Sequence, residues 1–387
     1  MSTLIGGLFN GISIGSVLLI AALGLAIVFG LMGVINLAHG ELMMLGAYAT
    51  FVVQNIFKPL GEPWFDFYII VAIPVAFIVS AIAGLILERG AIRFLYGRPL
   101  ETLLATWGVS LILRQFVRSV NWLMIIGIGI FCLLFFGGME LLKKRSNWQR
   151  IKNQTIALLL PLSGGIAIAV YSLLSDNSVL TKAWFSARNV DVTAPRWLRG
   201  GTGVLGFQIP YVRLFIIVLT ILCLIGVYWF LQRSTWGLKI RAVTQNRTMS
   251  SCLGIPTAQV DALTFALGSG LAGIAGCAVS LLGSVGPNTG QNYIVDTFMV
   301  VVVGGVGNLL GTVIAALGIG TLSYLVSSGT IAALMLNSSN LPQPIIDFVL
   351  FFATTSMAKV MVFALIITFL QIKPAGLFPQ KGRTAEL

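Results

Sequence analysis

Two ionisable side chains interrupt the apolar N-terminal part of the chain. His39, the one histidine of the protein, and Glu41 are flanked by long apolar runs with no other charged side chain from Met1 to Phe57. Because such groups are costly to bury in lipid, they mark a helix break or a path for a polar solute. They belong to residues 33–48, Gly-Val-Ile-Asn-Leu-Ala-His-Gly-Glu-Leu-Met-Met-Leu-Gly-Ala-Tyr.

Two roles, compatible with each other, suit His39 and Glu41. In the first, they brace the break, with Glu41 where a helix N-terminus favours negative charge. In the second, they line the path of a solute or couple to it. Bracing is favoured because a polar group at a buried break must first satisfy backbone amides. A second glycine-rich break follows later in the chain, so the candidate residues for a helix break and pathway are Asn36, His39, Gly40, Glu41, Gly304, Gly305, Gly307 and Asn308.

The sequence predicts no catalytic residue, metal site or cofactor. Residues 11–15, Gly-Ile-Ser-Ile-Gly, spell a nucleophile elbow, but Ser13 lies in a predicted helix where that chemistry needs a strained turn, and its base would have to be His39. No GxxxxGK[ST] motif is present to hold ATP. A single histidine excludes an HExxH zinc site, and the four cysteines show no CxxC spacing.

Composition identifies the elements that carry these residues as membrane helices. Hydrophobic residues make up 57% of the chain and charged residues 9%, with a mean hydropathy of +0.96. Apolar runs long enough to cross a bilayer as helix recur along the chain, and the 43 glycines favour close helix packing. We predict an all-α polytopic membrane protein with roughly nine full spans and a broken or re-entrant element at 298–325.

The basic residues are clustered at the ends of apolar runs. The net charge is +12, and 15 of the 24 Lys and Arg residues fall within four stretches, 89–98, 143–152, 233–247 and 373–383. Such clusters are typical of cytoplasmic loops, so we expect these stretches and the C-terminus inside and the N-terminus outside. Nucleic acid is not a predicted partner, because no basic face on a soluble domain is present.

The cytoplasmic connection at 232–257 is longer than topology alone requires. Trp236, Ile240 and Val243 recur at helical spacing, and Gly254 supplies a stop. An ordinary positive-inside loop is the simple interpretation, but a loop with its own amphipathic helix favours docking of a soluble partner. The candidate coupling residues are Trp236, Gly237, Arg241, Gln245, Asn246 and Gly254.

Several of these stretches resemble a known family. Residues 34–48 closely resemble the signature of the LivH-type permeases of branched-chain amino-acid ABC importers and their urea-importing relatives. Two further stretches, 189–197 (Asn-Val-Asp-Val-Thr-Ala-Pro-Arg-Trp) and 241–247 (Arg-Ala-Val-Thr-Gln-Asn-Arg), are more similar to the urea permeases of the UrtB type. The resemblance covers nearly the whole chain except about 121–187.

The resemblance implies one permease domain over residues 1–387. Residues 121–187 would then be an inserted two-helix hairpin with the start of an external loop, 188–210 a periplasmic loop, and 232–257 the loop that couples to an ATPase. The implied partners are a second permease subunit, two ATP-binding cassette ATPases and an external solute-binding protein, in the bacterial inner (plasma) membrane and its lipid bilayer.

The implied function is high-affinity urea uptake by alternating access, with ATP hydrolysed by the partner subunits. Three alternatives stay open: a permease for branched-chain amino acids or short amides, a passive urea channel, and an intramembrane hydrolase acting through Ser13. Urea is small and neutral, so its path needs hydrogen-bonding groups and no fixed counter-charge, which suits the few intramembrane charges slightly better than an amino-acid zwitterion does.

Overall fold

Two compact units make up the chain. The computed structural model describes residues 2–143, 148–175, 181–182, 184–185, 188–204, 207–330, 351 and 355–378. The larger unit comprises Met1–Leu111 with Val190–Leu387, and the smaller one comprises Ile112–Asn189.

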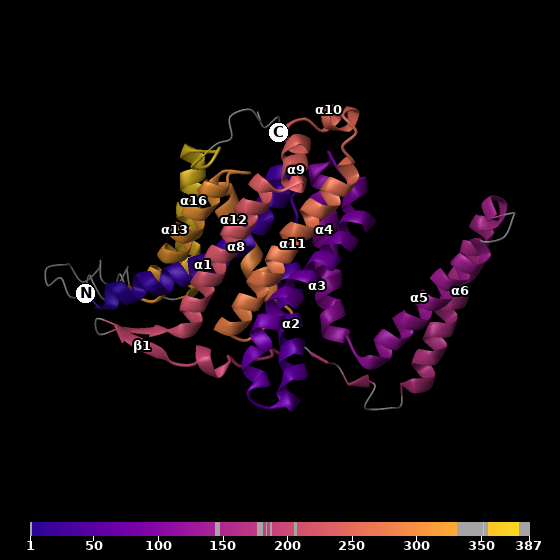
Figure 1. Cartoon of the computed structure of the whole chain (residues 1–387), viewed down its shortest axis with the longest axis horizontal. Coiled ribbons are helices and arrows are strands. Elements are labelled where there is room, and N and C mark those ends of the chain that lie inside the picture. The colour runs from indigo at the N-terminus through magenta and orange to yellow at the C-terminus, as the bar shows by residue number, and fades with distance from the viewer. Residues whose placement is uncertain are drawn as a thin grey trace. The chain divides into compact units, whose positions relative to one another are not determined.

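Helices form nearly all of the larger unit (Figure 1). Its long helices are α1 (Ser2–Met32), α2 (His39–Phe57), α3 (Tyr68–Gly90), the start of α4 (Pro99–Ser119), α8 (Tyr211–Arg233), α11 (Thr257–Leu282), α12 (Thr289–Gly304), α13 (Leu309–Ser327) and α16 (Thr355–Ile372). Shorter elements join them: the 3-10 turns η1 (Lys58–Leu60), η2 (Trp64–Phe67), η3 (Ile92–Phe94) and η4 (Arg196–Leu198), and helices α9 (Thr235–Gln245) and α10 (Arg247–Cys252).

The predicted all-α membrane fold is confirmed. Among the described residues, six helices are long and apolar enough to cross a membrane: α1, the α3 region, α5, α8, α11 and α13. The other expected spans at 41–57, 101–119 and 156–174 are helical but shorter or less uniformly apolar. The last expected span, 345–369, lies partly outside the described residues, and α16 forms its second part.

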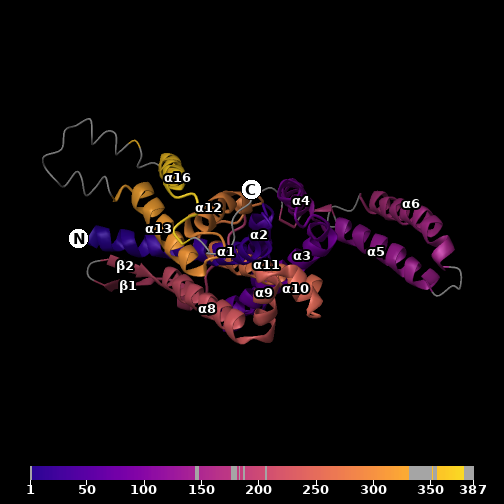
Figure 2. The same ribbon diagram turned by 90° about the horizontal axis from the view of Figure 1, so that it is seen from above.

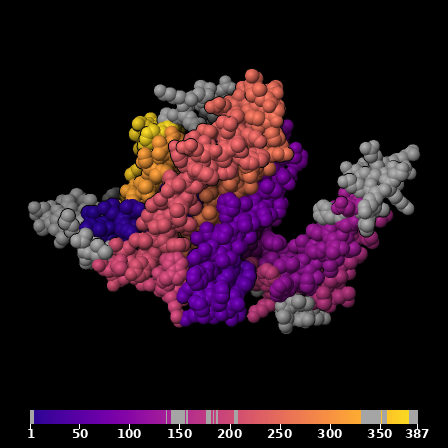
Figure 3. Space-filling view, viewed as in Figure 1, coloured from indigo at the N-terminus to yellow at the C-terminus, as the bar shows by residue number. Residues whose placement is uncertain are grey.

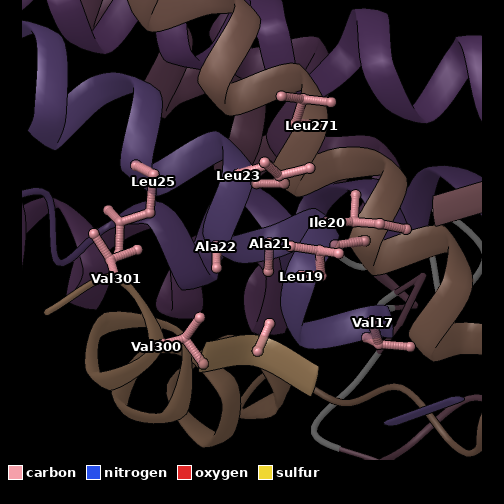
Figure 4. Packing of buried hydrophobic residues seen from close by; sticks show 14 of the residues in the cluster. Val17, Leu19, Ile20, Ala21, Ala22, Leu23, Leu25, Leu271, Val300 and Val301 are labelled. Atoms are coloured by element: carbon pink, nitrogen blue, oxygen red, sulfur yellow. The ribbon is translucent and has the colours of Figure 1, made fainter. Parts of the chain in front are cut away.

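Helix α1 is the centre of the larger unit. The core cluster packs residues 17–27 of α1 against α11, α12 and α13, as Figure 4 shows for Leu23, Leu271 and Val300. In the view of Figure 2, α12, α13 and α16 lie on one side of α1 and α8 lies on the other. This placement explains why α1 is apolar all round, as helices buried on every side are.

Small residues set the closest helix contacts. Gly7, Gly11 and Gly15 lie four residues apart on α1, and the sequence predicts that they clear one face for a neighbour. That neighbour is α13, which runs antiparallel to α1: Gly7 lies against Leu325, and Gly15 against the backbone of Ala316.

The loops at the end of the larger unit opposite α9 and α10 are tied together. The Tyr68 hydroxyl donates to the Thr193 carbonyl at 2.8 Å, and Arg196 forms an ion pair with Glu62. The sequence suggests a short strand near 189–201. In this stretch Val190 forms an isolated bridge with Val285, and an antiparallel hairpin of β1 (Gly201–Val204) and β2 (Phe207–Pro210) follows.

The smaller unit contains two packed helices. These are α5 (Trp122–Lys143) and α6 (Trp148–Leu174), and α5 is apolar enough to span a membrane. Trp122 and Trp184 pack edge to face, with ring centroids 4.7 Å apart. The basic stretch 143–152 between the helices lies partly outside the described residues, and the interpretation of 121–187 as an insertion remains a prediction.

Candidate functional site

The first helix break brings polar residues into the middle of the bundle. Helix α1 ends at Met32, and Gly33 follows with φ of +68°, a conformation that glycine adopts without strain. The chain then runs back along α1, because the Nε2 atom of His39 lies 3.0 Å from the carbonyl oxygen of Ala21. Ala21 precedes the end of α1 by about 16 Å at 1.5 Å per residue. Helix α2 therefore begins deep inside the protein.

Helix α4 contributes a buried polar row that faces this break. Thr102, Thr106 and Ser110 are spaced by four residues and are all buried. The backbone N–H of Leu37 donates to the Thr106 hydroxyl at 3.1 Å, which satisfies an amide that the break exposes. The Asn36 side chain accepts a hydrogen bond from the Ala38 N–H at 3.0 Å.

Glu41 lies in the first turn of α2 and is 1% exposed. The Ser110 hydroxyl donates to its Oε1 atom at 3.0 Å. Gly40 beside it contacts the backbone of Gly290, so the N-terminal turns of α2 and α12 meet here. Two helix N-termini concentrate partial positive charge, which a glutamate in the first turn offsets. His39 is 1% exposed and Asn36 is 2% exposed, so these side chains are enclosed by the rest of this chain.

Like the first break, the second has a glycine of positive φ directly after the helix that ends. Helix α12 ends at Gly304, and α13 begins at Leu309. Between them, Gly305 has a φ of +97° and Gly307 a φ of +84°. The Asn308 side chain accepts from the N–H groups of Leu310 and Gly311, so it caps α13. The sequence aligns Gly33 with Gly305 and Asn36 with Asn308 at one constant offset.

The two breaks differ in depth. Gly307 lies against Gly30, close to the end of α1, so α13 starts at one end of the bundle rather than deep inside it. The backbone of a C-terminal strap, Lys373–Phe378, covers this break: the Leu377 N–H donates to the Val303 carbonyl at 2.8 Å, and the Asn308 amide donates to the Phe378 carbonyl at 3.4 Å.

The expected coupling segment is a capped pair of helices, α9 and α10 (Figure 1). Ser234 caps α9 by accepting from the Gly237 N–H at 2.8 Å, and Asn246 caps α10 by accepting from the Met249 N–H at 2.9 Å. Gly254 has φ of +80° and ends the segment. The predicted amphipathic face is confirmed, since Ile240 and Val243 are buried.

The remaining candidate residues of this segment take different positions. Trp236 is partly buried and carries the Lys239 ammonium over its ring at 4.6 Å. Gln245 is exposed. The Arg241 side chain turns back towards the bundle, where its guanidinium donates to the Gln232 side chain at 2.7 Å.

A four-residue network, which the sequence interpretation missed, ties α10 to the bundle. It comprises Glu88 of α3, Tyr96, Arg247 of α10 and Asp261 of α11. The Tyr96 hydroxyl donates to Glu88 at 3.0 Å, the Arg247 guanidinium stacks 4.9 Å from the Tyr96 ring centroid, and Arg247 pairs with Asp261 at 2.5 Å. Burial and then the Glu88 carboxylate raise the pKa of Tyr96 above its usual range, so the phenol keeps its proton. The sequence feature that could have indicated this network is the pair of acidic residues, Glu88 and Asp261, inside otherwise apolar runs.

Enzymatic alternatives find no support in this arrangement. Ser13 lies within α1 and not on a strained strand-to-helix turn. Within the part of the chain that the structure describes, no three His, Cys, Asp or Glu side chains gather as metal ligands.

The fold and these sites define a polytopic helical membrane protein, and comparison with known proteins shows its family. The family model described as "Branched-chain amino acid transport system / permease component" matches residues 7–370. The chain therefore belongs to this family of membrane permeases, and it is a multi-pass protein of the inner (plasma) membrane and not an enzyme.

Three relatives illustrate the similarity. The chain is 26% identical over 315 residues to the high-affinity branched-chain amino acid transport permease BraD of Pseudomonas aeruginosa, covering 81% of the chain and 83% of the relative. It is 23% identical over 372 residues to LivH of Salmonella typhimurium, with 96% and 94% covered. A probable LivH of Methanocaldococcus jannaschii is 25% identical over 313 residues, with 81% and 78% covered. No solved structure matches the chain. These findings support the wider family and not the finer urea-type resemblance.

Proposed function

We propose that the chain is the permease subunit of an ATP-driven importer for branched-chain amino acids. Its partners would be a second permease subunit, two ATP-binding cassette ATPases and an external solute-binding protein. The named relatives support the amino-acid substrate. The observation on this chain that supports an ATPase partner is the α9–α10 segment, which is capped at the start of both helices and exposes Leu238, Met249 and Leu253 at one end of the bundle.

The outer face of this segment suits an ATPase groove. Leu238, Met249 and Leu253 are 62%, 60% and 80% exposed, whereas the opposite face packs on Leu231 and Val260. The segment stands at the surface in the space-filling view (Figure 3). Exposed apolar side chains on a short helix are the usual anchors when a helix enters a groove on a partner.

The contacts of the segment supply a route for motion into the spans. The four-residue network joins α10 to α3 and α11, and Arg241 with Gln232 joins α9 to α8. A push by the ATPase on α9–α10 would therefore act on three spans at once, as alternating access requires. The conformation of the segment would be maintained by the remaining candidate coupling residues, Trp236, Gly237, Gln245, Asn246 and Gly254.

The two helix breaks would serve as braced joints of the moving bundle. Hydrogen bonds to the Ala21 carbonyl and the Thr106 hydroxyl, and one donated by the Ser110 hydroxyl, would hold the first break. The Asn308 side chain, which accepts from the Gly311 N–H, would hold the second. Because His39 and Glu41 are enclosed by protein, bracing suits them better than contact with a solute. A path for the solute would then form at the contact with the second permease.

The ends of the larger unit differ in charge, which supports an orientation. Arg89, Arg93, Arg233, Lys239 and Lys373 accompany α9, α10 and the strap at one end, so this end would be cytoplasmic, with the C-terminus inside. The loops 58–67 and 188–210 at the other end would receive the solute-binding protein.

Urea remains a second candidate substrate, because residues 189–197 and 241–247 resemble urea permeases. Competition of labelled leucine and labelled urea uptake, in cells with and without this chain, separates the two. We expect gene-dependent uptake of leucine that unlabelled leucine and valine inhibit and urea does not. Gene-dependent uptake of urea that leucine leaves unchanged would show that urea, and not an amino acid, is the substrate. Urea flux without ATP through vesicles that contain this chain alone would contradict an ATP-driven importer.

ATPase docking can be tested with a matched pair of variants. Leu253→Asp places a charge on the outer face of the segment, and we expect it to abolish co-purification of the ATPase. Leu100→Asp changes a leucine that is 81% exposed at the start of α4, outside the segment, and should leave co-purification intact. Equal retention of the ATPase by both variants would contradict docking at α9–α10.

A further inference from the structure

An apolar cleft with a cationic end lies between α1, α8 and α13. Its volume is about 650 Å³, and its apolar wall includes Leu23, Ile27, Leu224, Val227 and Val313. At one end the wall turns polar, with Gln232, Arg241 and Asn308. None of the residues lining the cleft is acidic.

Arg241 is the unusual member of this wall. Its guanidinium donates to Gln232, but its Nε atom is buried and makes no hydrogen bond, and no carboxylate among the described residues pairs with it. An arginine presents a planar fork of donors that matches a phosphate. Because no residue that lines the cleft is acidic, an anion from outside the chain would complement the Arg241 charge.

The shape of the cleft fits an acyl chain below that anion. The lining runs from Leu23 to Leu31 on α1 and from Leu224 to Gln232 on α8. Eight residues of helix cover about 12 Å, against about 15 Å for the hydrocarbon half of a bilayer. A smaller apolar space of about 220 Å³ shares Ile27, Val227 and Leu231 with the cleft and extends it beside α8.

We propose that this cleft binds one anionic phospholipid, with its phosphate on Arg241 and an acyl chain along α1, α8 and α13. A basic pocket between membrane helices is a recurrent form of lipid headgroup site. A helix of the second permease would fill the apolar part as well, but an apolar helix face would leave the Arg241 charge without an anion. The inference goes beyond the importer function and does not depend on the solute carried.

Native mass spectrometry of the assembled importer tests the site. The protein is reconstituted with equal amounts of phosphatidylglycerol and phosphatidylcholine and then extracted into detergent. We expect one retained phosphatidylglycerol for each copy of this chain. Retention should fall about tenfold in Arg241→Gln, which loses a charge-assisted contact. Arg233→Gln removes a charge at the end of α8 that does not line the cleft, and should retain lipid as the native protein does.

A second pair of variants tests the acyl groove. Val313→Trp fills the cleft and should displace the lipid, whereas Ile314→Trp, at a neighbouring residue of α13 that is 51% exposed and does not line it, should not. Equal retention of phosphatidylcholine, or retention that Arg241→Gln leaves unchanged, would overturn the proposal. Absence of lipid from the assembled importer would overturn it too, because the second permease would then occupy the cleft. Solute uptake is measured in a separate assay, so a negative result for lipid binding does not affect the test of import, and a negative result for import does not affect the test of lipid binding.

Discussion

Replacing Arg247 by glutamine should loosen α10 much more than replacing its partner Asp261 by asparagine. The Asp261 side chain is 4% exposed and that of Arg247 is 48% exposed. Removal of Arg247 leaves a carboxylate buried without its counter-charge, whereas Asp261→Asn leaves a half-exposed arginine that water can solvate. The two variants break the same ion pair but leave different groups behind.

The size of the effect follows from these exposures. Losing one partner of a fully buried pair costs about 3–5 kcal/mol. Solvent screens the exposed half of Arg247, so we expect about 2 kcal/mol for Arg247→Gln, or roughly 30-fold in the opening of α10. For Asp261→Asn we expect about threefold or less. The exposed pair Arg98–Glu101 is the control, and Arg98→Gln should change little.

Hydrogen exchange of the α10 amides, read by mass spectrometry on the purified protein, measures this opening directly. The double variant Arg247→Gln with Asp261→Asn should exchange close to the Asp261→Asn level, since it no longer contains a buried unpaired carboxylate. Equal exchange in the two single variants, or an Arg247→Gln effect no larger than that of Arg98→Gln, would refute the anchoring role of the network.

Two further predictions concern packing and capping. A Cβ at Gly276 would overlap the Met43 carbonyl of α2, so Gly276→Ala should cost about 1–3 kcal/mol of stability and broaden the size-exclusion profile. Gly108→Ala on α4 is the control, because its Cβ meets open space. Equal profiles for the two variants would contradict close packing of α2 on α11. Asn308→Ala should cost about 1 kcal/mol and raise hydrogen exchange in the first turn of α13, because Leu310 and Gly311 lose their cap. Asn308→Asp keeps an acceptor and should exchange as the native protein does; exchange as fast as in the alanine variant would argue against the cap.

Local patterns predicted what local physics decides. Apolar run length located the long helices, the four-residue spacing of Gly7, Gly11 and Gly15 predicted a packing face, and the spacing of Ile240 and Val243 predicted α9. Each depends on periodicity along one helix, which the sequence displays.

Features that depend on distant contacts were missed. Helix α12 begins at Thr289, well before the apolar run at 298. Its polar first turns contact Gly40, and Asp296 forms an ion pair with Lys359. Hydropathy counts the Asp296 charge against a span, although this ion pair compensates it. The reversal of the chain at 33–38 depends on Ala21 and Thr106, which no local pattern connects to it. Arg241 was expected to contact the ATPase, and the sequence did not indicate that its side chain turns towards α8.

The C-terminal strap has a consequence for how the protein is made. The turn at 305–308 takes its last hydrogen bonds from Leu377 and Phe378, which leave the ribosome only after α13 and α16 have been synthesised. At about 5–20 residues per second, the turn waits several seconds with its polar backbone only partly satisfied. The hydrogen bonds that join the strap to the turn between α12 and α13 can therefore form only after both helices have been synthesised.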